Sequence, residues 1–245
     1  RFGGFFIFEP DGFSYLAKMR QGAAGAWLFT LPYTTEFQQG APVYFFYLLL
    51  GGLAALIGLE MNTVYQLARL VGSLALCWTA YQLLIELLPG RRAGRLAWLV
   101  ILWGGGASWL ISMLDPRYVA FASVAPDAFF YSALYGPPHI VCALALLLAL
   151  VLAGRQALSQ EGELLPGRTL ALGAGGLALG LMRESYYLVL VGVLAAYWLA
   201  LSLLRRRAQW MAAQRLVLLA LPGGAYALLL WLTFRYNPTM AAWAA

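Results

Sequence analysis

Long runs of apolar residues, separated by short polar connections, make up most of this chain. Several of these runs contain about 18 or more residues, and a helix of about 20 apolar residues can cross the roughly 30 Å hydrocarbon core of a bilayer. No segment alternates apolar and polar positions as the strands of a membrane barrel do. The pattern predicts an all-α, polytopic transmembrane helical bundle. The runs cover residues 41–59, 64–88, 96–113, 138–154, 169–182, 187–204 and 216–234.

The most polar stretch near the start of the chain covers residues 9–40. Within it, residues 11–20 have apolar side chains at helical spacing, which predicts a short helix lying at the membrane interface. The side chains expected to face lipid or protein are Phe13, Tyr15, Leu16 and Met19. Residues 2–8 are largely apolar and the chain has no initiator methionine, so we expect a processed chain or a fragment whose residues 2–8 end an earlier helix.

The run at 41–59 can be interpreted in two ways. It either crosses the membrane or lies in the interface as a juxtamembrane helix. Its Gly51-Gly52 pair and its end at Gly58-Leu59-Glu60 favour the interfacial interpretation. We therefore expect about six crossings plus interfacial helices, in a single membrane domain over residues 1–245. In this domain, residues 9–60 form an extracytoplasmic loop and residues 64–234 form the transmembrane bundle.

Composition agrees with a membrane environment. Hydrophobic residues make up 62% of the chain, charged residues only 11%, and the mean hydropathy is +0.75. A soluble domain has about 25% charged residues. The net charge of +6 does not indicate nucleic acid, because the basic residues lie between apolar runs rather than on one face. The expected partners are membrane lipids, and no nucleic acid.

The basic residues predict how the chain is oriented. The connections at 89–95, 155–168 and 205–215 hold nine of the sixteen basic residues. If every run from residue 64 onward crosses the membrane, these connections share one face, and the positive-inside rule makes that face cytoplasmic. The acidic connections, with Asp115, Asp127 and Glu184, then lie outside. The predicted location is the inner (plasma) membrane.

Several kinds of chemistry are excluded. His139 is the only histidine, so a metal site built from several histidines is impossible. The sequence has no phosphate-binding Gly-rich loop, no GxSxG elbow and no metal-spaced cysteine pair. His139 opens a membrane helix after Gly136-Pro137-Pro138. It either bonds locally at that helix start, or acts near a phosphate or carboxylate or as a ligand.

Acidic residues are the first candidate site. Glu9-Pro10-Asp11 precedes the interfacial helix, and Pro126-Asp127 precedes another helix. Each aspartate occupies a position where a helix N-cap is expected, so capping is one interpretation. The other is a carboxylate pair at the membrane surface. In that case Asp11, with Glu9, and Asp127 are catalytic: one takes a proton from an acceptor hydroxyl, and either helps to hold a divalent cation.

Charged residues near the ends of the runs are the second candidate site. Arg183 and Glu184 lie at a tight turn between two apolar runs, followed by Tyr186-Tyr187. They form either an interfacial ion pair or a binding site. Arg69 lies about one turn inside the run at 64–88, where a charge is costly. It either extends toward the interface or meets a lipid phosphate.

Small residues predict close helix packing. Gly176 and Gly180 form a small-xxx-small pair, which lets two membrane helices approach closely. Two further clusters, Gly104-Gly105-Gly106 and Pro222-Gly223-Gly224, are expected to bend or loosen their helices.

The order of these features resembles the GT-C class of membrane glycosyltransferases, which includes aminoarabinose transferases and protein O-mannosyltransferases. The resemblance covers most of the chain as a GT-C-like amino-terminal module, and its motifs are short. It implies transfer of a sugar from a polyprenyl-phosphate carrier outside the cytoplasm. By analogy Asp11 is the base or a metal ligand, Asp127 a supporting carboxylate, and Arg69 or Arg183 a phosphate partner. The matching segments are Asp11 with Glu9, residues 41–44, Gly58 to Arg69, Arg91-Arg92 and Pro126-Asp127.

Two functions are therefore expected. The first is a membrane glycosyltransferase that uses a polyprenyl-phosphate sugar, with Asp11, Glu9 and Asp127 catalytic. In this function Arg69, Arg183, Glu184 and His139 bind the substrate or its phosphate. The second is a non-catalytic accessory subunit of a larger energy-converting or photosynthetic membrane complex, whose partners are other membrane subunits.

Overall fold

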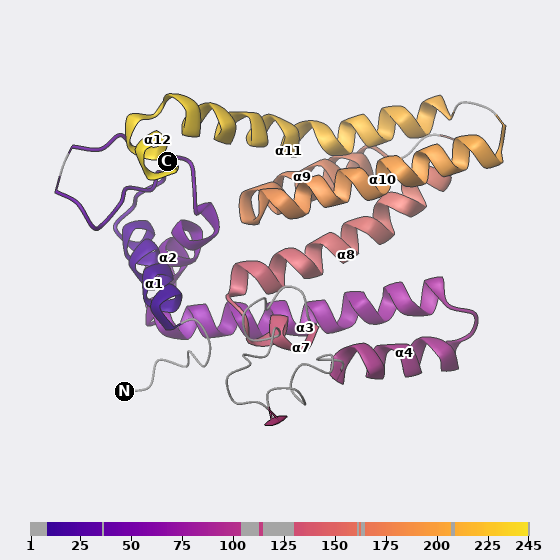
Figure 1. Ribbon diagram of the computed structural model, residues 1–245, viewed down its shortest axis with the longest axis horizontal. Coiled ribbons are helices and arrows are strands. Elements are labelled where there is room, and N and C mark those ends of the chain that lie inside the picture. The colour runs from indigo at the N-terminus through magenta and orange to yellow at the C-terminus, as the bar shows by residue number, and fades with distance from the viewer. Residues whose placement is uncertain are drawn as a thin grey trace.

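The protein is a bundle of α-helices, described by a computed structural model (Figure 1). The structure describes residues 9–35, 37–103, 113–114, 130–160, 162, 165–206 and 209–244. No strand occurs among these residues, and an isolated antiparallel bridge joins Phe29 to Ala41. The predicted all-α class is confirmed. The helices are α1 (Glu9–Ala23), α2 (Phe45–Ile57), α3 (Met61–Leu87), α4 (Arg91–Trp103), α7 (Phe130–Tyr135), α8 (Pro138–Ser159), α9 (Pro166–Met182), α10 (Glu184–Leu204), α11 (Trp210–Tyr236) and α12 (Pro238–Ala244).

Four of the described helices are long and apolar enough to cross a membrane, namely α3, α8, α10 and α11. This is fewer than the six crossings expected from the sequence. The run at 169–182 forms α9, which has 17 residues and is about 26 Å long at 1.5 Å per residue. The described part of the run at 96–113 gives α4, which has 13 residues up to Trp103. The count of six treated every apolar run from residue 64 onward as a full crossing.

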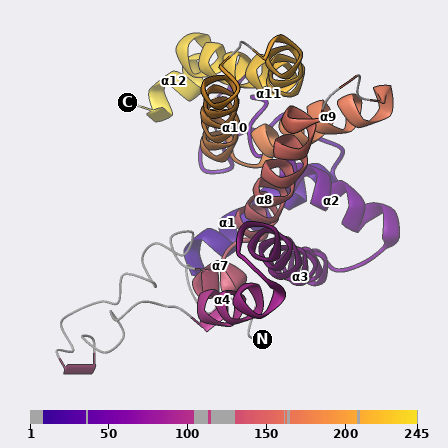
Figure 2. The ribbon, with the colours of Figure 1, turned by 90° about the vertical axis from the view of Figure 1, so that its right-hand side faces the viewer.

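The long helices run side by side and place different chemistry at the two ends of the bundle (Figure 1). α3, α8 and α10 end at one end, where α4, α9 and α11 begin. We call this the arginine end, because the described arginines of the three predicted basic connections lie there. At the other end lie α1, α2, the turn between α9 and α10, and α12, which together form the α1–α2 end (Figures 1 and 2).

α2 lies across the α1–α2 end rather than along the bundle (Figure 1). Its 13 residues span about 20 Å, which is too short for a crossing. Two glycines bring it against α1. A Cβ atom on Gly51 would lie 1.9 Å from the Met19 carbonyl oxygen, and one on Gly22 would lie 1.9 Å from the Leu48 carbonyl oxygen. The two helices therefore touch backbone to backbone and form one unit. This geometry agrees with the interfacial interpretation of the run at 41–59.

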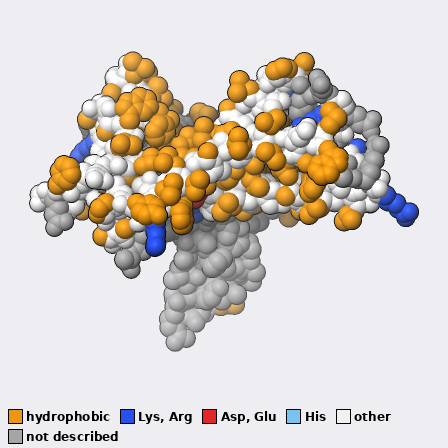
Figure 3. Space-filling view, turned by 90° about the horizontal axis from the view of Figure 1, so that it is seen from above, with side chains coloured by type: hydrophobic (Ala, Val, Ile, Leu, Met, Phe, Trp, Pro, Cys, Tyr) orange, Lys and Arg blue, Asp and Glu red, His pale blue; other side chains and the backbone are white. Residues whose placement is uncertain are grey.

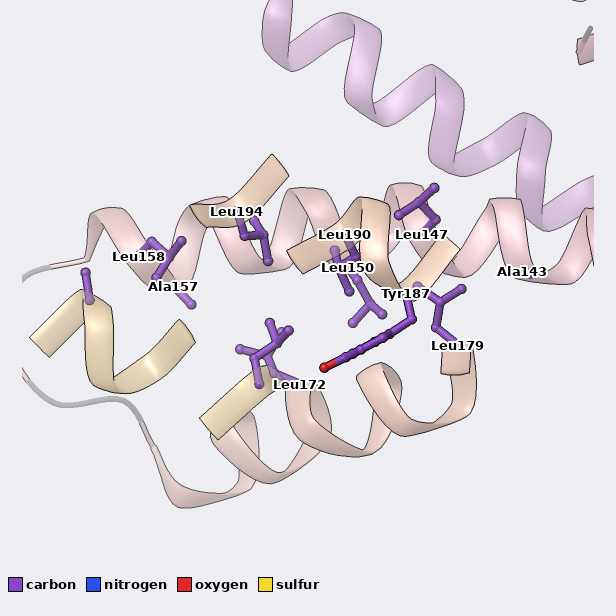
Figure 4. Packing of buried hydrophobic residues seen from close by; sticks show 12 residues of the cluster. Ala143, Leu147, Leu150, Ala157, Leu158, Leu172, Leu179, Tyr187, Leu190 and Leu194 are labelled. Atoms are coloured by element: carbon purple, nitrogen blue, oxygen red, sulfur yellow. The ribbon is translucent and has the colours of Figure 1, made fainter. Parts of the chain in front are cut away.

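The core of the bundle is apolar and lies between α8, α9, α10 and α11 (Figure 4). Leu190 and Leu179 are fully buried there, and Tyr187 donates a hydrogen bond to the Ala220 carbonyl. A Cβ on Gly176 would lie 2.7 Å from the Leu219 carbonyl oxygen. The predicted small-residue packing of this helix is thus confirmed, with α11 as its neighbour.

Two other expectations concern helix continuity. α11 is one helix from Trp210 to Tyr236 with Pro222 inside it, so the expected loosening at Pro222-Gly223-Gly224 does not interrupt the helix. Gly104-Gly105-Gly106 lies outside the described residues.

The outside of the bundle is apolar. Hydrophobic side chains cover most of the described surface seen in Figure 3. Only 17% of the most apolar window of α3 is buried inside the chain, and Val71, Leu74 and Trp78 on this helix are exposed. Exposed apolar surface of this extent requires lipid around it. The chain is a membrane protein.

Candidate functional site

Two neighbouring cavities lie at the α1–α2 end, and Tyr44 lines both of them. The Arg183 cavity has a volume of about 370 Å³ and takes its walls from segments far apart in the sequence. The Asp11 cavity has a volume of about 440 Å³ and lies between α1 and residues 29–44. The Arg183 cavity is lined by Val43, Tyr44, Phe46, Tyr47, His139, Leu181, Met182, Arg183, Glu184, Ser185, Tyr226, Leu230 and Phe234. The Asp11 cavity is lined by Asp11, Ser14, Tyr15, Lys18, Phe29, Leu31, Tyr33, Thr34 and Tyr44.

Tyr44, between the cavities, has an unusual backbone conformation. Its φ of 56° and ψ of 28° lie in the left-handed region, which costs a non-glycine residue about 1–3 kcal/mol. Burial raises the pKa of the Tyr44 phenol, and the nearby carboxylates of Glu184 and Asp11 raise it further. Both carboxylates are therefore close enough to act on Tyr44, one from each cavity. Strain of this kind is concentrated at functional sites.

His139, in the first turn of α8, contacts α2. Its Nδ1 lies 2.7 Å from the Tyr47 hydroxyl, although the two residues are 92 positions apart. The Tyr15 ring stacks on the Tyr47 ring with centroids 4.4 Å apart, and the edge of the His139 ring meets both. The bond between Tyr47 and His139 ties α8 to α2. Three rings from three helices form one wall of the site.

Lys18 is a buried cation in the wall of the Asp11 cavity. Its side chain is 7% exposed, and its Nζ donates to Ser14 Oγ at 2.7 Å. The same ammonium lies 4.2 Å from the centroid of the Tyr44 ring and 4.9 Å from that of Tyr15, which are cation–π distances. Burial lowers the pKa of Lys18 to about 8, although the Asp11 carboxylate opposes that shift. A cation held by rings and one hydroxyl keeps donors for a ligand.

The turn between α9 and α10 brings a second cation to the site. Arg183 has extended backbone angles and is both the C-cap residue of α9 and the N-cap residue of α10. Glu184 is the first residue of α10. The Arg183 guanidinium lies 5.3 Å from the centroid of the Tyr186 ring. Both Arg183 and Glu184 line the same cavity as His139. The sequence correctly predicted a tight turn here, and the structure gives that turn a cavity.

The structure describes two of the three residues of the predicted acidic site. Asp11 lines its cavity, but it is the third residue of α1 and not the N-cap, because the helix already begins at Glu9. Glu9 is the first residue of that helix. Asp127 lies outside the described residues, so the predicted pairing of Asp11 with Asp127 stays a prediction. Within the described residues, Glu184 lines the neighbouring cavity, which shares Tyr44 with the Asp11 cavity.

Arg69 does not line either cavity. It lies in the third turn of α3, is half-buried, and its carbonyl oxygen accepts a hydrogen bond from Ser73 Oγ at 2.8 Å. Of the four residues expected to bind substrate or phosphate, His139, Arg183 and Glu184 come together at one cavity, and Arg69 lies apart from it.

No group of three or more histidine, cysteine, aspartate or glutamate side chains suited to a metal ion occurs among the residues that the structure describes. Cation charge at the site comes instead from Lys18 and Arg183. The cavities combine two cations, two carboxylates and several aromatic rings. Such a set suits a ligand that has both a phosphate and a ring-shaped polar group, because aromatic faces pack against sugar rings and cations neutralise phosphate.

Three residues of this site were not identified from the sequence: Lys18, Tyr44 and Tyr47. Lys18 is four residues after Ser14 on the face of α1 next to Met19, so its spacing carried a weak signal. Tyr44 was noted only within the matching segment 41–44, with no role at the site, and Tyr47 looked like an ordinary aromatic residue near the start of an apolar run. Comparison with protein-family models, with curated proteins and with solved structures found no match to this chain.

Proposed function

We propose that this protein is a membrane glycosyltransferase that uses a sugar linked to polyprenyl phosphate. The observation that carries the proposal is the pair of adjoining cavities at Tyr44, with Asp11 and Lys18 in one and Arg183, Glu184 and His139 in the other. The site lies at an end of the bundle, where a lipid carrier can place its phosphate near the membrane surface while its polyprenyl chain stays in the hydrocarbon. The resemblance to the GT-C class supports the same assignment.

In the proposed reaction, Asp11 is the general base. An acceptor hydroxyl loses its proton to the Asp11 carboxylate as its oxygen attacks the anomeric carbon of the sugar. The bond from that carbon to the carrier phosphate oxygen breaks, and polyprenyl phosphate leaves with the electron pair. Arg183 and Lys18 stabilise the negative charge on the departing phosphate. The rings of Tyr44 and Tyr47 hold the sugar.

The orientation belongs to the same proposal. By the positive-inside rule, the arginine end faces the cytoplasm and the α1–α2 end faces the extracytoplasmic side of the inner membrane. Described arginines at the arginine end include Arg91, Arg92, Arg95 and Arg168. A carrier-linked sugar that has been moved across the membrane is then presented on the side where the cavities open.

The test measures carrier release. Purified protein in detergent is incubated with a panel of undecaprenyl-phosphate hexoses and a membrane extract as acceptor source, and free undecaprenyl phosphate is quantified by mass spectrometry. We expect release that depends on the extract, and a loss of about 100-fold or more in Asp11→Asn, the size of effect typical of a general base. Size-exclusion elution and thermal midpoint should match the wild type.

The matched control is Glu60→Gln. Glu60 is an exposed carboxylate at the start of α3 and lines neither cavity. The Glu60→Gln protein should release undecaprenyl phosphate at the wild-type level. Full release by a folded Asp11→Asn protein would refute the catalytic assignment. Recovery of the wild type only in a fixed-stoichiometry complex, with no release from any donor, would favour an accessory subunit.

A further inference from the structure

A groove between α3 and α4 lies at the other end of the molecule. The groove has a volume of about 520 Å³ and apolar walls, with a single charged residue, Arg95, among those that line it. It belongs to neither cavity of the candidate site. Its lining residues are Leu74, Cys77, Trp78, Tyr81, Arg95, Trp98 and Leu99.

The packing of the two helices builds this groove. Gly94 lets α4 approach α3, because a Cβ atom there would lie 2.8 Å from Ile85 Cγ2. Closer to the middle of the bundle, the indole Nε1 of Trp98 donates to the Cys77 carbonyl at 3.0 Å. The Trp98 ring meets the Tyr81 ring edge to face at 6.0 Å. The aromatic side chains are fixed by these contacts, and they form a floor instead of filling the space.

Arg95 places a positive charge at the edge of the groove. It is exposed, and the described residues include no hydrogen-bond or ion-pair partner for it. Arg91 and Arg92 precede it by four and three positions, so the three side chains lie on neighbouring parts of one helix face. The first turn of α4 has no acidic residue to offset their repulsion. A bound anion would reduce that repulsion.

We infer that this groove binds an anionic phospholipid. Its acyl chain lies along Leu74, Trp78 and Leu99, and its phosphate and headgroup meet Arg95. The order of the residues fits a lipid, since the cation is near the α3–α4 turn and the apolar wall runs from there toward the middle of the bundle. Basic pockets between membrane helices are sites for anionic headgroups. Tryptophan and tyrosine are common at the headgroup level.

The experiment is native mass spectrometry of the full chain in detergent, with dioleoyl phosphatidylglycerol or dioleoyl phosphatidylcholine added. The acyl chains are identical, so any difference reports the headgroup. We expect the wild type to retain phosphatidylglycerol preferentially. Arg95→Gln should weaken that binding about fivefold, the size expected for one arginine beside a lipid headgroup. Arg95→Lys, which preserves the charge, should retain most of the preference.

Arg168→Gln is the matched control. Arg168 also lies at the arginine end and is half-buried; it bonds to Gln156 and Gln160 and lies outside the groove. The Arg168→Gln substitution removes the same charge as Arg95→Gln and should leave phosphatidylglycerol binding unchanged. Equal retention of both lipids by the wild type, or equal losses in Arg95→Gln and Arg168→Gln, would overturn the inference. Because no sugar donor is involved, the result is independent of the proposed transferase activity.

Discussion

Two buried cations at opposite ends of this molecule have very different surroundings. Arg215, at the arginine end, is 9% exposed and donates to three backbone carbonyls, those of Ala157 at 2.6 Å, Gln160 at 2.7 Å and Gly162. Lys18, at the α1–α2 end, is 7% exposed, and its hydrogen-bond acceptor among the described residues is Ser14 Oγ. The remaining sides of its ammonium face aromatic rings and a cavity.

The difference lies in how many hydrogen bonds each cation makes to the protein. Arg215 satisfies carbonyl groups at and beyond the end of α8, where an α-helix leaves its last carbonyls without partners. Lys18 donates one side-chain hydrogen bond within the described residues, to Ser14, lines the Asp11 cavity, and is buried in a way that disfavours its charged form. Two cations of similar burial therefore differ in what holds them, and only Lys18 lies at a cavity of the proposed site.

Of the substitutions that test this difference between Arg215 and Lys18, Arg215→Met is expected to have the largest effect. Removing the guanidinium leaves three carbonyls without their donor, so we expect the free energy of unfolding to fall by about 2–4 kcal/mol. Thermal unfolding in detergent, followed by circular dichroism, measures the loss. Arg215→Lys should show a smaller fall in the free energy of unfolding, because one nitrogen cannot reach all three oxygens. An unchanged thermal midpoint in Arg215→Met would show that Arg215 is not structural.

A smaller effect is expected from moving Lys18 without changing it. Gly51→Ala places a methyl group against the Met19 carbonyl and pushes α1 away from α2. Overpacking of this kind costs about 1–3 kcal/mol, and we expect weaker binding of undecaprenyl phosphate, measured by native mass spectrometry. Gly52→Ala is the adjacent control, since its Cβ would have its nearest neighbour at 3.7 Å. Similar behaviour of the two variants would mean that the α1–α2 contact does not position the site.

The smallest effect is the pH dependence of Lys18. Because burial lowers the pKa of Lys18 from its ordinary value of 10.5 to about 8, the folded state loses this proton before the unfolded state does. The free energy of unfolding should therefore rise between about pH 8 and pH 10.5, while binding of undecaprenyl phosphate weakens as the pH passes 8. The titratable groups near Lys18 are Asp11, Tyr15 and Tyr44. Burial raises the pKa of Tyr15 to about 12 and also that of Tyr44.

Lys18→Met is the control for this titration. It should show neither the rise in stability nor the loss of binding around pH 8, because it has no proton to lose. Thermal midpoints and bound lipid, both measured in steps from pH 7 to pH 10, distinguish the two proteins. Parallel pH profiles would show that another group titrates and that Lys18 does not meet the phosphate.

The sequence predicted those features that depend on neighbouring residues. Apolar runs marked the long helices, the polar stretch at 9–40 contained a helix, and Arg183-Glu184 marked a tight turn. The described arginines of the three basic connections lie at one end, as expected from runs that traverse the bundle one after another. Among the described residues, four helices meet the length of a full crossing, fewer than the six expected, because the run at 169–182 gives α9 with 17 residues and the run at 96–113 is described only as far as Trp103.

Contacts between distant residues could not be predicted in this way. The bond between Tyr47 and His139 joins two apolar runs, and neither the spacing nor the composition of either run specifies the partner. The same holds for Lys18, whose burial depends on rings contributed by residues 29 and 44 as well as by its own helix. Asp11 was identified because acidic residues are rare in this chain. Glu184 was identified as well, but the sequence did not show that the cavities of Asp11 and Glu184 meet at Tyr44.

The last helices of the chain also hold the first loop in place, with a consequence for biogenesis. Tyr226 donates a hydrogen bond to the Pro42 carbonyl at 2.8 Å across 184 positions, Asn237 donates to the Gln39 carbonyl, and Met240 is buried against Phe29 and Ala41. At 5–20 residues per second, synthesis takes roughly 10–40 s to pass from Pro42 to Tyr226. During that interval the α1–α2 unit waits at the membrane surface without its final support. The Arg183 cavity, which Tyr226, Leu230 and Phe234 of α11 help to line, is complete only after α11 has been inserted. A site that needs both cavities therefore forms only when the whole bundle is assembled.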